Sequence, residues 1–263
     1  MNYLLILIMI TIHCTPIINR IAFKPDTTDY GIQKISKFNG KIIFLKNNNG
    51  HKISGCLLLC KSSKHVILSF RGQGGNFSDN IAGLACLRDL GYHVFSIDYQ
   101  GYGLSEGKPS EKSNYINSDL AFTFLTDSLN YKSEDIFVIG RSVGTTNATY
   151  IAQRNKIGGL ILIQPLTSGK EYIKYHTLNI FSVFAGKSFD NESRIKDIKC
   201  PLLVIHGTKD NVIPLSMGKK IFNLCHTPKK FVSIHNANHE NIDSLGNDII
   251  NTSISEFINK YKN

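Results

Sequence analysis

The sequence predicts a three-layer α/β fold with a mostly parallel central sheet of about eight strands, flanked by helices. Short runs rich in β-branched residues alternate with amphipathic stretches from about residue 41 onward. The later runs, such as residues 159–163 and 201–206, are continuously apolar, as expected for strands that are covered on both faces. The chain of 263 residues shows no internal repeat, low-complexity linker or second composition zone, so we expect one large domain.

Strands are expected where runs of Val, Ile, Leu and Phe are bounded by Gly, Asn or Asp. In chain order these runs are residues 41–45, 53–60, 65–70, 93–99, 136–139, 159–163, 201–206 and 230–234. Helices are expected where apolar residues recur at spacings of three and four, at residues 79–90, 114–129, 143–153, 216–224 and 242–261. Right-handed crossovers would join these strands into one open sheet. Residues 166–199 contain no strand and several aromatic residues, which predicts a small helical cap.

Composition limits the functional class. Hydrophobic residues make up 42% of the chain and charged residues 19%, which suits a protein that buries a core. This composition excludes a chain that is entirely disordered, collagen-like or coiled-coil. The net charge is +10, but the lysines are scattered without a basic block, so we expect a solvated basic surface and no nucleic-acid partner. Six cysteines without a C-x-x-C spacing indicate neither a disulfide scaffold nor a zinc module.

The first residues form a separate hydrophobic segment. Residues 3–12 are an unbroken apolar run, shorter than the ~20 residues that span a bilayer comfortably. We therefore expect residues 1–19 to be a signal or membrane anchor and residues 20–263 to form the main domain. A retained anchor followed by Arg20 and Lys24 would keep the domain cytoplasmic, whereas a cleaved signal would export it. In the alternative interpretations, Cys14 carries a lipid, or the segment is a buried first strand or helix.

The strongest chemical signal is a G-x-S-x-G pentapeptide at Gly140-Arg141-Ser142-Val143-Gly144. It joins the apolar strand at residues 136–139 to a predicted helix, which is the setting of a nucleophile elbow. Glycines suit this turn because the serine backbone is strained and neighbouring chains pass close to it. The helix amino terminus behind the turn would supply positive potential to a developing oxyanion. Ser142 is therefore the candidate nucleophile.

A serine hydroxyl is a poor nucleophile at neutral pH, so it needs an imidazole base that is held by a carboxylate. Asp210 lies just past the predicted strand at residues 201–206, and His239 follows the last predicted strand. The order serine, acid, histidine matches the elbow fold. In the alternative interpretations, Asp210 only forms a turn, or the base is His235 or His206.

Stabilisation of the oxyanion should come from two backbone N–H groups. One belongs to Val143, directly after the nucleophile, and the other to the loop at residues 69–76. Gln73 is the expected donor in this loop, whose glycines let the backbone approach the substrate. In the alternative interpretation, this loop is only a flexible turn without a role in catalysis. No metal ligand is needed for this chemistry.

Five further segments accompany the elbow in the same chain order. They are Phe70-Arg-Gly-Gln-Gly-Gly-Asn76, Asp98-Tyr-Gln-Gly-Tyr-Gly-Leu-Ser-Glu-Gly-Lys-Pro-Ser110, Leu162-Ile-Gln-Pro-Leu-Thr-Ser168, His206-Gly-Thr-Lys-Asp210 with Ile213-Pro214, and His239. Together they resemble the α/β-hydrolase superfamily, and within it the amino-terminally anchored α/β-hydrolase-domain serine hydrolases that include protein depalmitoylases. The resemblance implies the α/β-hydrolase fold with a short cap, acyl-enzyme chemistry on esters or thioesters, and no cofactor.

The resemblance is incomplete in the oxyanion loop. Relatives usually read H-G-N-x-G-N there, whereas this chain has Arg71 and Gln73 at the first and third places. Arg71 could hold an acidic leaving group or pair with a carboxylate. We expect the stretch from Asp98 to Ser110 to be structural.

The sequence thus predicts a membrane-associated serine hydrolase that acts on lipid-linked acyl substrates, such as a palmitoylated protein or a lysophospholipid. A peptidase or amidase with the same triad is one alternative. Another is a non-catalytic binding protein with a distorted oxyanion loop. The sequence does not determine acyl-chain length, leaving group or oligomeric state.

Overall fold

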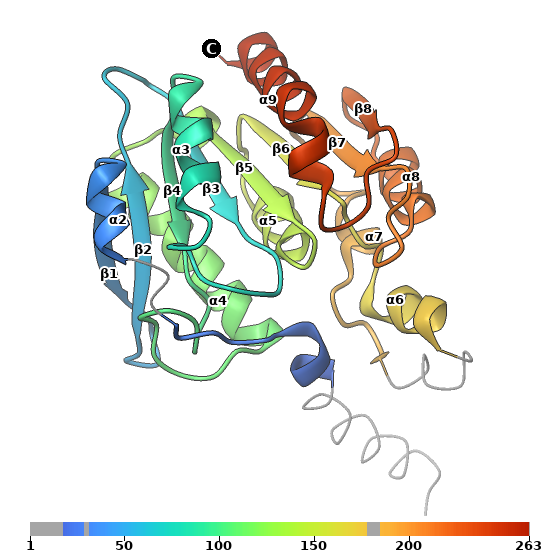
Figure 1. Cartoon of the computed structure of the whole chain (residues 1–263), viewed down its shortest axis with the longest axis horizontal. Coiled ribbons are helices and arrows are strands. Elements are labelled where there is room, and N and C mark those ends of the chain that lie inside the picture. The colour runs from blue at the N-terminus through green and yellow to red at the C-terminus, as the bar shows by residue number, and fades with distance from the viewer. Residues whose placement is uncertain (1–17, 29–31, 178–184, 263) are drawn as a thin grey trace, which may run out of the picture.

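One eight-stranded sheet forms the centre of the protein, in the order β1-β2-β4-β3-β5-β6-β7-β8 (Figure 1). The computed structural model describes residues 18–28, 32–177 and 185–262. The strands are β1 (Gly40–Lys46), β2 (Lys52–Leu58), β3 (Val66–Phe70), β4 (His93–Ile97), β5 (Ile136–Arg141), β6 (Gly159–Ile163), β7 (Leu202–Gly207) and β8 (Lys229–Ile234). Strand β2 is antiparallel to β1 and β4, and the other neighbours are parallel. The predicted fold class is confirmed.

Helices cover both faces of the sheet (Figure 1). They are α2 (Ile32–Lys37), α3 (Ile81–Asp89), α4 (Glu111–Thr123), α5 (Gly144–Arg154), α6 (Gly169–His176), α7 (Asn191–Arg194), α8 (Leu215–Leu224) and α9 (Ile242–Tyr261). Buried side chains of α2, α3 and α9 share one hydrophobic cluster with the strands, and those of α4, α5 and α8 share the other. Helix α2 was not expected from the sequence.

The start of α4 differs from the expectation. The helix begins at Glu111, three residues before the predicted start, because Ser110 caps it. The Ser110 hydroxyl accepts from the Ser113 backbone N–H at 3.0 Å, and the Ser113 hydroxyl accepts from the Ser110 N–H at 2.9 Å. This reciprocal capping satisfies N–H groups that a helix start otherwise leaves unpaired.

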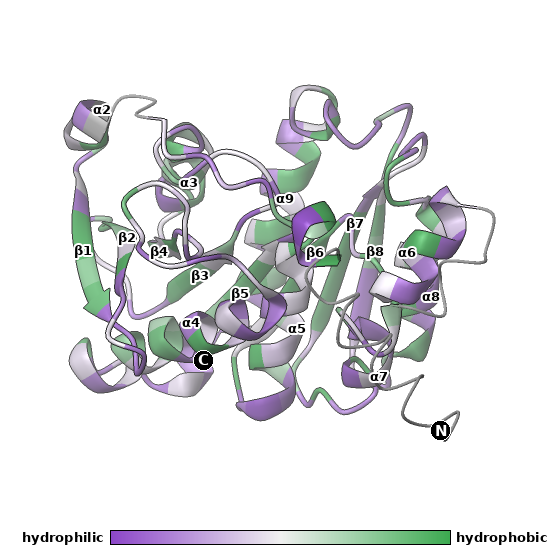
Figure 2. Cartoon of the chain, turned by 90° about the horizontal axis from the view of Figure 1, so that it is seen from below, coloured by the Kyte–Doolittle hydropathy of each residue, from purple (hydrophilic) through white to green (hydrophobic). Residues whose placement is uncertain are grey.

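The central strands form the core. Every residue of β3, β6 and β7 is buried, and Figure 2 shows apolar residues concentrated on the central strands. Because both faces are covered by helices, alternate side chains enter two separate clusters: Leu68 and Val138 lie in one, and Ile67 and Ile139 lie in the other. The core thus holds the carboxyl ends of the parallel strands together at one edge, where the loops carry the candidate site.

Between β6 and β7, the described residues form two short helices, α6 and α7, in the region where a cap was expected. Asn191 anchors it to the sheet domain: its buried amide donates to the Leu166 carbonyl at 3.0 Å and to the Thr145 hydroxyl at 3.2 Å. The Arg194 guanidinium lies over the Tyr115 ring, 4.5 Å from its centroid. Residues 178–184, which include two of the predicted cap aromatics, lie outside the described residues.

The predicted localisation requires a correction. The predicted membrane localisation is not supported: over residues 18–28, 32–177 and 185–262, no helix is long and apolar enough to cross a membrane. The apolar run at residues 3–12 lies outside the described residues. Helix α9 has 20 residues, but it carries acidic and basic side chains on its outer face, as an amphipathic helix of a globular domain does. Phe23, which follows the predicted anchor segment in the sequence, is buried, and its ring centroid lies 6.3 Å from that of Tyr99.

Candidate active site

Ser142 stands on a sharp turn between β5 and α5. Its φ is 52°, a left-handed conformation that is strained for a residue with a side chain. The turn is held from both sides, because the Ser142 N–H donates to the Ile163 carbonyl at 2.9 Å and its carbonyl accepts from the Thr145 hydroxyl at 2.6 Å. The structure therefore has the strained serine turn that the pentapeptide predicts.

The two glycines of the pentapeptide are needed for close packing. A Cβ at Gly144 would lie 2.2 Å from the carbonyl oxygen of Arg71, and a Cβ at Gly140 would lie 2.7 Å from the Cβ of Ala148. Both distances are far below van der Waals contact, so only glycine fits at these positions. Gly144 thereby lets the start of α5 pack directly on the backbone of the predicted oxyanion loop.

The three predicted site residues meet at the carboxyl edge of the sheet. His239 Nε2 lies 3.0 Å from Ser142 Oγ, and His239 Nδ1 lies 2.9 Å from Asp210 Oδ2. The Asp210 side chain is fully buried, whereas the His239 side chain keeps 17% of its surface exposed. The imidazole therefore bridges a buried carboxylate and a hydroxyl on the strained turn.

The carboxylate of Asp210 is held by donors on both oxygens. Oδ1 accepts from the backbone N–H groups of Val212 and Ile213 at 3.0 and 2.9 Å, and Oδ2 accepts from the Gln164 amide at 2.8 Å. Burial alone would raise the pKa of Asp210, but hydrogen bonds from His206, His239 and the Ile213 backbone outweigh it and lower the pKa. Asp210 is therefore ionised and oriented toward the imidazole.

The two alternative histidines lie elsewhere. His206 is completely buried on β7, with Nε2 2.8 Å from the Ile213 carbonyl and 3.5 Å from Asp210 Oδ2. This position lets it orient the loop that carries the acid. His235 is exposed at the end of β8. The structure thus brings His239, and neither alternative, to the serine.

Gln164 contributes to the site, although the sequence assigned it no role. It directly follows β6, has a φ of 52° and is fully buried. Its amide donates to Asp210 and also to the Asn238 carbonyl at 3.1 Å, next to His239. The signal that could have found it is its place after a strand between β5 and β7, because the carboxyl ends of neighbouring parallel strands lie together.

Arg141 is a second contributor that the sequence did not reveal. Its guanidinium donates to the His239 carbonyl at 3.3 Å and pairs with Asp243 at the start of α9. It therefore ties the end of β5 to the loop that carries the histidine. Residue types at the second position of a G-x-S-x-G motif vary, so the spacing alone does not predict this contact.

The predicted oxyanion loop runs beside the serine. A Cβ on Gly72 would lie 3.6 Å from the Ser142 Cβ, which is ordinary contact distance. The side-chain amide of Gln73 donates to the Ile21 carbonyl, and the Gln73 backbone carbonyl accepts from the Tyr102 hydroxyl at 2.7 Å. Val143, the other predicted donor, immediately precedes α5. Arg71 pairs with two carboxylates, Asp79 and Asp98.

Within the part of the chain that the structure describes, no group of three His, Cys, Asp or Glu side chains could hold a metal ion.

The chain is similar to known hydrolases. Residues 63–190 match a family described as serine aminopeptidase, S33. The chain is 32% identical over 206 residues to the α/β-hydrolase domain-containing protein 17B of Xenopus laevis, which covers 76% of this chain and 69% of that protein. The human protein 17B is 31% identical over 205 residues, with the same coverage.

Solved structures share the fold. An esterase from Pyrococcus furiosus superposes with a TM-score of 0.73 and 18% identity, covering 91% of this chain and 98% of that one. An α/β hydrolase from Vibrio vulnificus also gives a TM-score of 0.73 and 18% identity, with coverage of 94% and 92%. At this level of identity the likeness concerns the fold alone.

Proposed function

We propose a mechanism from the premise that this chain belongs to the α/β-hydrolase domain-containing proteins and is a hydrolase of the esterase type. In this proposal it cleaves carboxylic ester or thioester bonds through Ser142, His239 and Asp210. One observation carries it: a continuous chain of contacts runs from the Ser142 hydroxyl through both nitrogens of His239 to a buried carboxylate. This is the arrangement that activates a serine.

The proposed reaction has two halves. Ser142 Oγ attacks the acyl carbonyl as His239 Nε2 takes the hydroxyl proton, and the alcohol or thiol leaves with that proton. Water then attacks the acyl-enzyme, with His239 again as base, and releases the acid and free serine. Asp210 stays ionised throughout, holds the Nδ1–H tautomer and stabilises the imidazolium that forms in each half.

In the same proposal, the backbone N–H groups of Val143 and Gln73 stabilise the negative charge on the carbonyl oxygen. Support comes from the position of Val143 at the start of α5, whose amino-terminal end is electropositive. Further support comes from the place of Gly72, next to Gln73, where an added Cβ would be in van der Waals contact with Ser142. Removing one such donor costs about 3–4 kcal/mol of barrier in other serine hydrolases.

The proposed substrate is an acyl group of lipid type in ester or thioester linkage. Its support is the resemblance to serine hydrolases that include protein depalmitoylases, together with the basic net charge of +10, which suits anionic substrates. A peptidase or amidase activity is the second candidate, because the matched family is described as a serine aminopeptidase.

The test is labelling of the full chain with a fluorophosphonate probe, followed by rates on p-nitrophenyl esters and acyl thioesters from short to long chains. Ser142→Ala and His239→Ala should abolish labelling and turnover, while Ser133→Ala, in the short 3-10 helix before β5, should leave both unchanged. Wild-type labelling that survives Ser142→Ala would contradict the mechanism. Faster turnover of an aminoacyl p-nitroanilide than of any ester would favour the peptidase, and no labelling of the folded protein would favour a binding role.

A further inference from the structure

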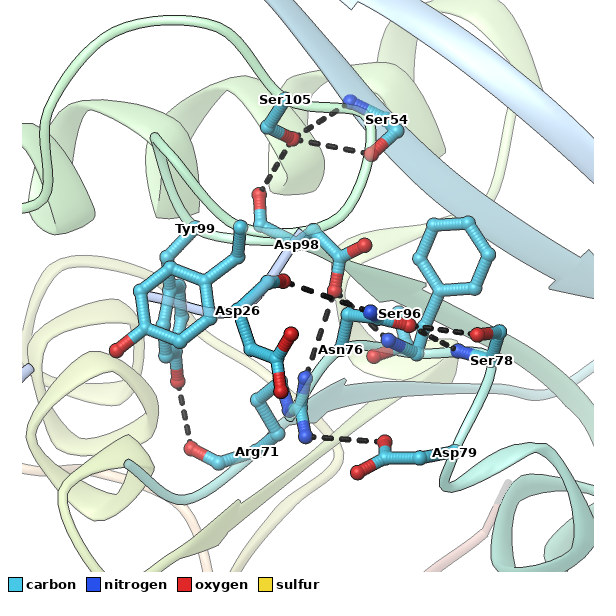
Figure 3. A network of polar contacts seen from close by, with 12 residues as sticks. Asp26, Ser54, Arg71, Asn76, Ser78, Asp79, Ser96, Asp98, Tyr99 and Ser105 are labelled. Carbon is cyan, nitrogen blue, oxygen red and sulfur yellow. Dashed lines mark hydrogen bonds and ion pairs between the residues drawn. The ribbon is translucent and has the colours of Figure 1, made fainter. Parts of the chain in front are cut away.

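Arg71 lies at the beginning of the oxyanion loop and is buried, with 8% of the residue exposed. A buried guanidinium is costly unless its charge is paired. Here Nη2 donates to the Gly74 carbonyl and to Asp79 Oδ1 at 3.2 Å, and Nη1 lies 3.7 Å from Asp98 Oδ1 (Figure 3). The side chain therefore folds back over its own loop and joins it to both carboxylates.

Asp98 connects this ion pair to the far side of the loop. It follows β4, has no exposed surface, and its Oδ1 also accepts from the Phe77 backbone N–H at 2.8 Å. Burial raises the pKa of Asp98 to about 7, although the Arg71 charge and the Phe77 N–H act to lower it. The guanidinium thus stabilises a carboxylate that holds the end of the loop.

The backbone of the same loop touches the nucleophile turn. The Arg71 carbonyl accepts from the Tyr99 hydroxyl at 2.7 Å. The same oxygen packs closely on Gly144, because a Cβ added there would lie only 2.2 Å from it. A movement of Arg71 would therefore shift the loop against Ser142. Catalytic groups must be held within about 0.5 Å of their productive geometry, so the position of this loop bears directly on catalysis.

From these contacts we propose that Arg71 is a positioning residue for the oxyanion loop, whose guanidinium sets the loop shape that points the Gln73 N–H at the substrate carbonyl oxygen. This inference rests on the function proposed for Ser142. In this inference Arg71 acts through the loop backbone and takes no direct part in the chemistry. The forked guanidinium is needed because it reaches the Gly74 carbonyl and two carboxylates at once, which an ammonium group cannot do in the same geometry.

The test is Arg71→Lys in the full chain, measured with a p-nitrophenyl ester and with a trifluoromethyl ketone, a probe that forms a tetrahedral oxyanion on the serine. We expect kcat to fall at least about 10-fold with KM within about 2-fold, because an interaction made only in the transition state is lost. The affinity for the ketone should fall by a similar factor. The matched control is Arg88→Lys, since the guanidinium of Arg88, in the last turn of α3, likewise contacts a backbone carbonyl and a carboxylate. It should change neither value.

Unchanged kcat and ketone affinity in a folded Arg71→Lys protein would overturn the inference while leaving the proposed function intact. Absence of Ser142-dependent turnover in the wild type would overturn both. If Arg71→Lys does not fold, Asp79→Asn decides, because the Asp79 side chain is 34% exposed and its loss should be tolerated. A several-fold lower kcat at unchanged KM supports the inference, and an unchanged kcat overturns it.

Discussion

The Gln164 amide donates to Oδ2 of Asp210 at 2.8 Å, the same oxygen that contacts Nδ1 of His239 at 2.9 Å. The carboxylate is therefore positioned by a side chain from the neighbouring strand as well as by its own loop. This contact is buried, and the Gln164 amide also reaches the loop of His239 through the Asn238 carbonyl. One glutamine thus links the proposed acid to the proposed base.

Gln164→Ala should lower kcat about 10-fold with little change in KM. That factor corresponds to about 1.4 kcal/mol, close to the lower limit for a hydrogen bond to a charged group. Steady-state kinetics on a short ester would measure it. The control is Gln153→Ala, which removes an exposed glutamine–aspartate hydrogen bond on α5 and should leave kcat unchanged. Equal rates for the two variants would show that Gln164 is not needed for positioning.

Arg141→Ala should reduce kcat about 3- to 10-fold, or about 0.7–1.4 kcal/mol, because the loop of His239 loses its tie to β5. Arg141→Lys should recover part of the loss through the ion pair with Asp243. Arg154→Ala, which removes an exposed arginine of α5, serves as the control. A rate equal to wild type in Arg141→Ala would rule out a positioning role.

Asp210→Asn should lower kcat by about 10³- to 10⁴-fold, because the amide cannot stabilise the imidazolium or hold its tautomer.

The lowered pKa of Asp210 also predicts a pH dependence of stability. A carboxylate whose folded pKa lies below its ordinary value of 3.8 stabilises the fold above that pH, and this contribution is lost as the pH falls toward the folded pKa.

Urea unfolding from pH 6 to pH 3 would measure this term. The stability advantage of the wild type over Asp210→Asn should be constant near pH 6 and shrink below about pH 4. Asp89→Asn, a change at an exposed aspartate, should show no comparable trend. An advantage that grows with acidity would mean that the carboxylate is not stabilised in the folded protein.

Gly144→Ala should destabilise the protein by about 2 kcal/mol or more, because the new Cβ would overlap the carbonyl oxygens of Arg71 and Phe70. Thermal or urea unfolding would measure the change. The matched control is Gly74→Ala, since a Cβ there meets no heavy atom within 4 Å. Its effect on stability should stay within about 0.5 kcal/mol, and similar losses for both variants would contradict the packing argument.

Local patterns carried most of the fold prediction. All eight strands lie close to the expected residues, because continuously apolar runs bounded by glycine, asparagine or aspartate have few other stable structures. The start of α4 at Glu111 shows the limit, since the Ser110 cap competes with apolar periodicity in setting the boundary. Helix α2 was missed, being only six residues long and held by burial of Ile35 against the sheet.

The sequence by itself determined the α/β class, the strained turn at Ser142, and the chain order of Ser142, Asp210 and His239, because each depends on neighbouring residues or on strand ends. Only the tertiary structure decided that His239 rather than His206 or His235 reaches the serine. It also decided the partners of the other buried polar groups. The sheet order places β6 between β5 and β7, and a contact between side chains from different strands depends on that order, which no local pattern contains.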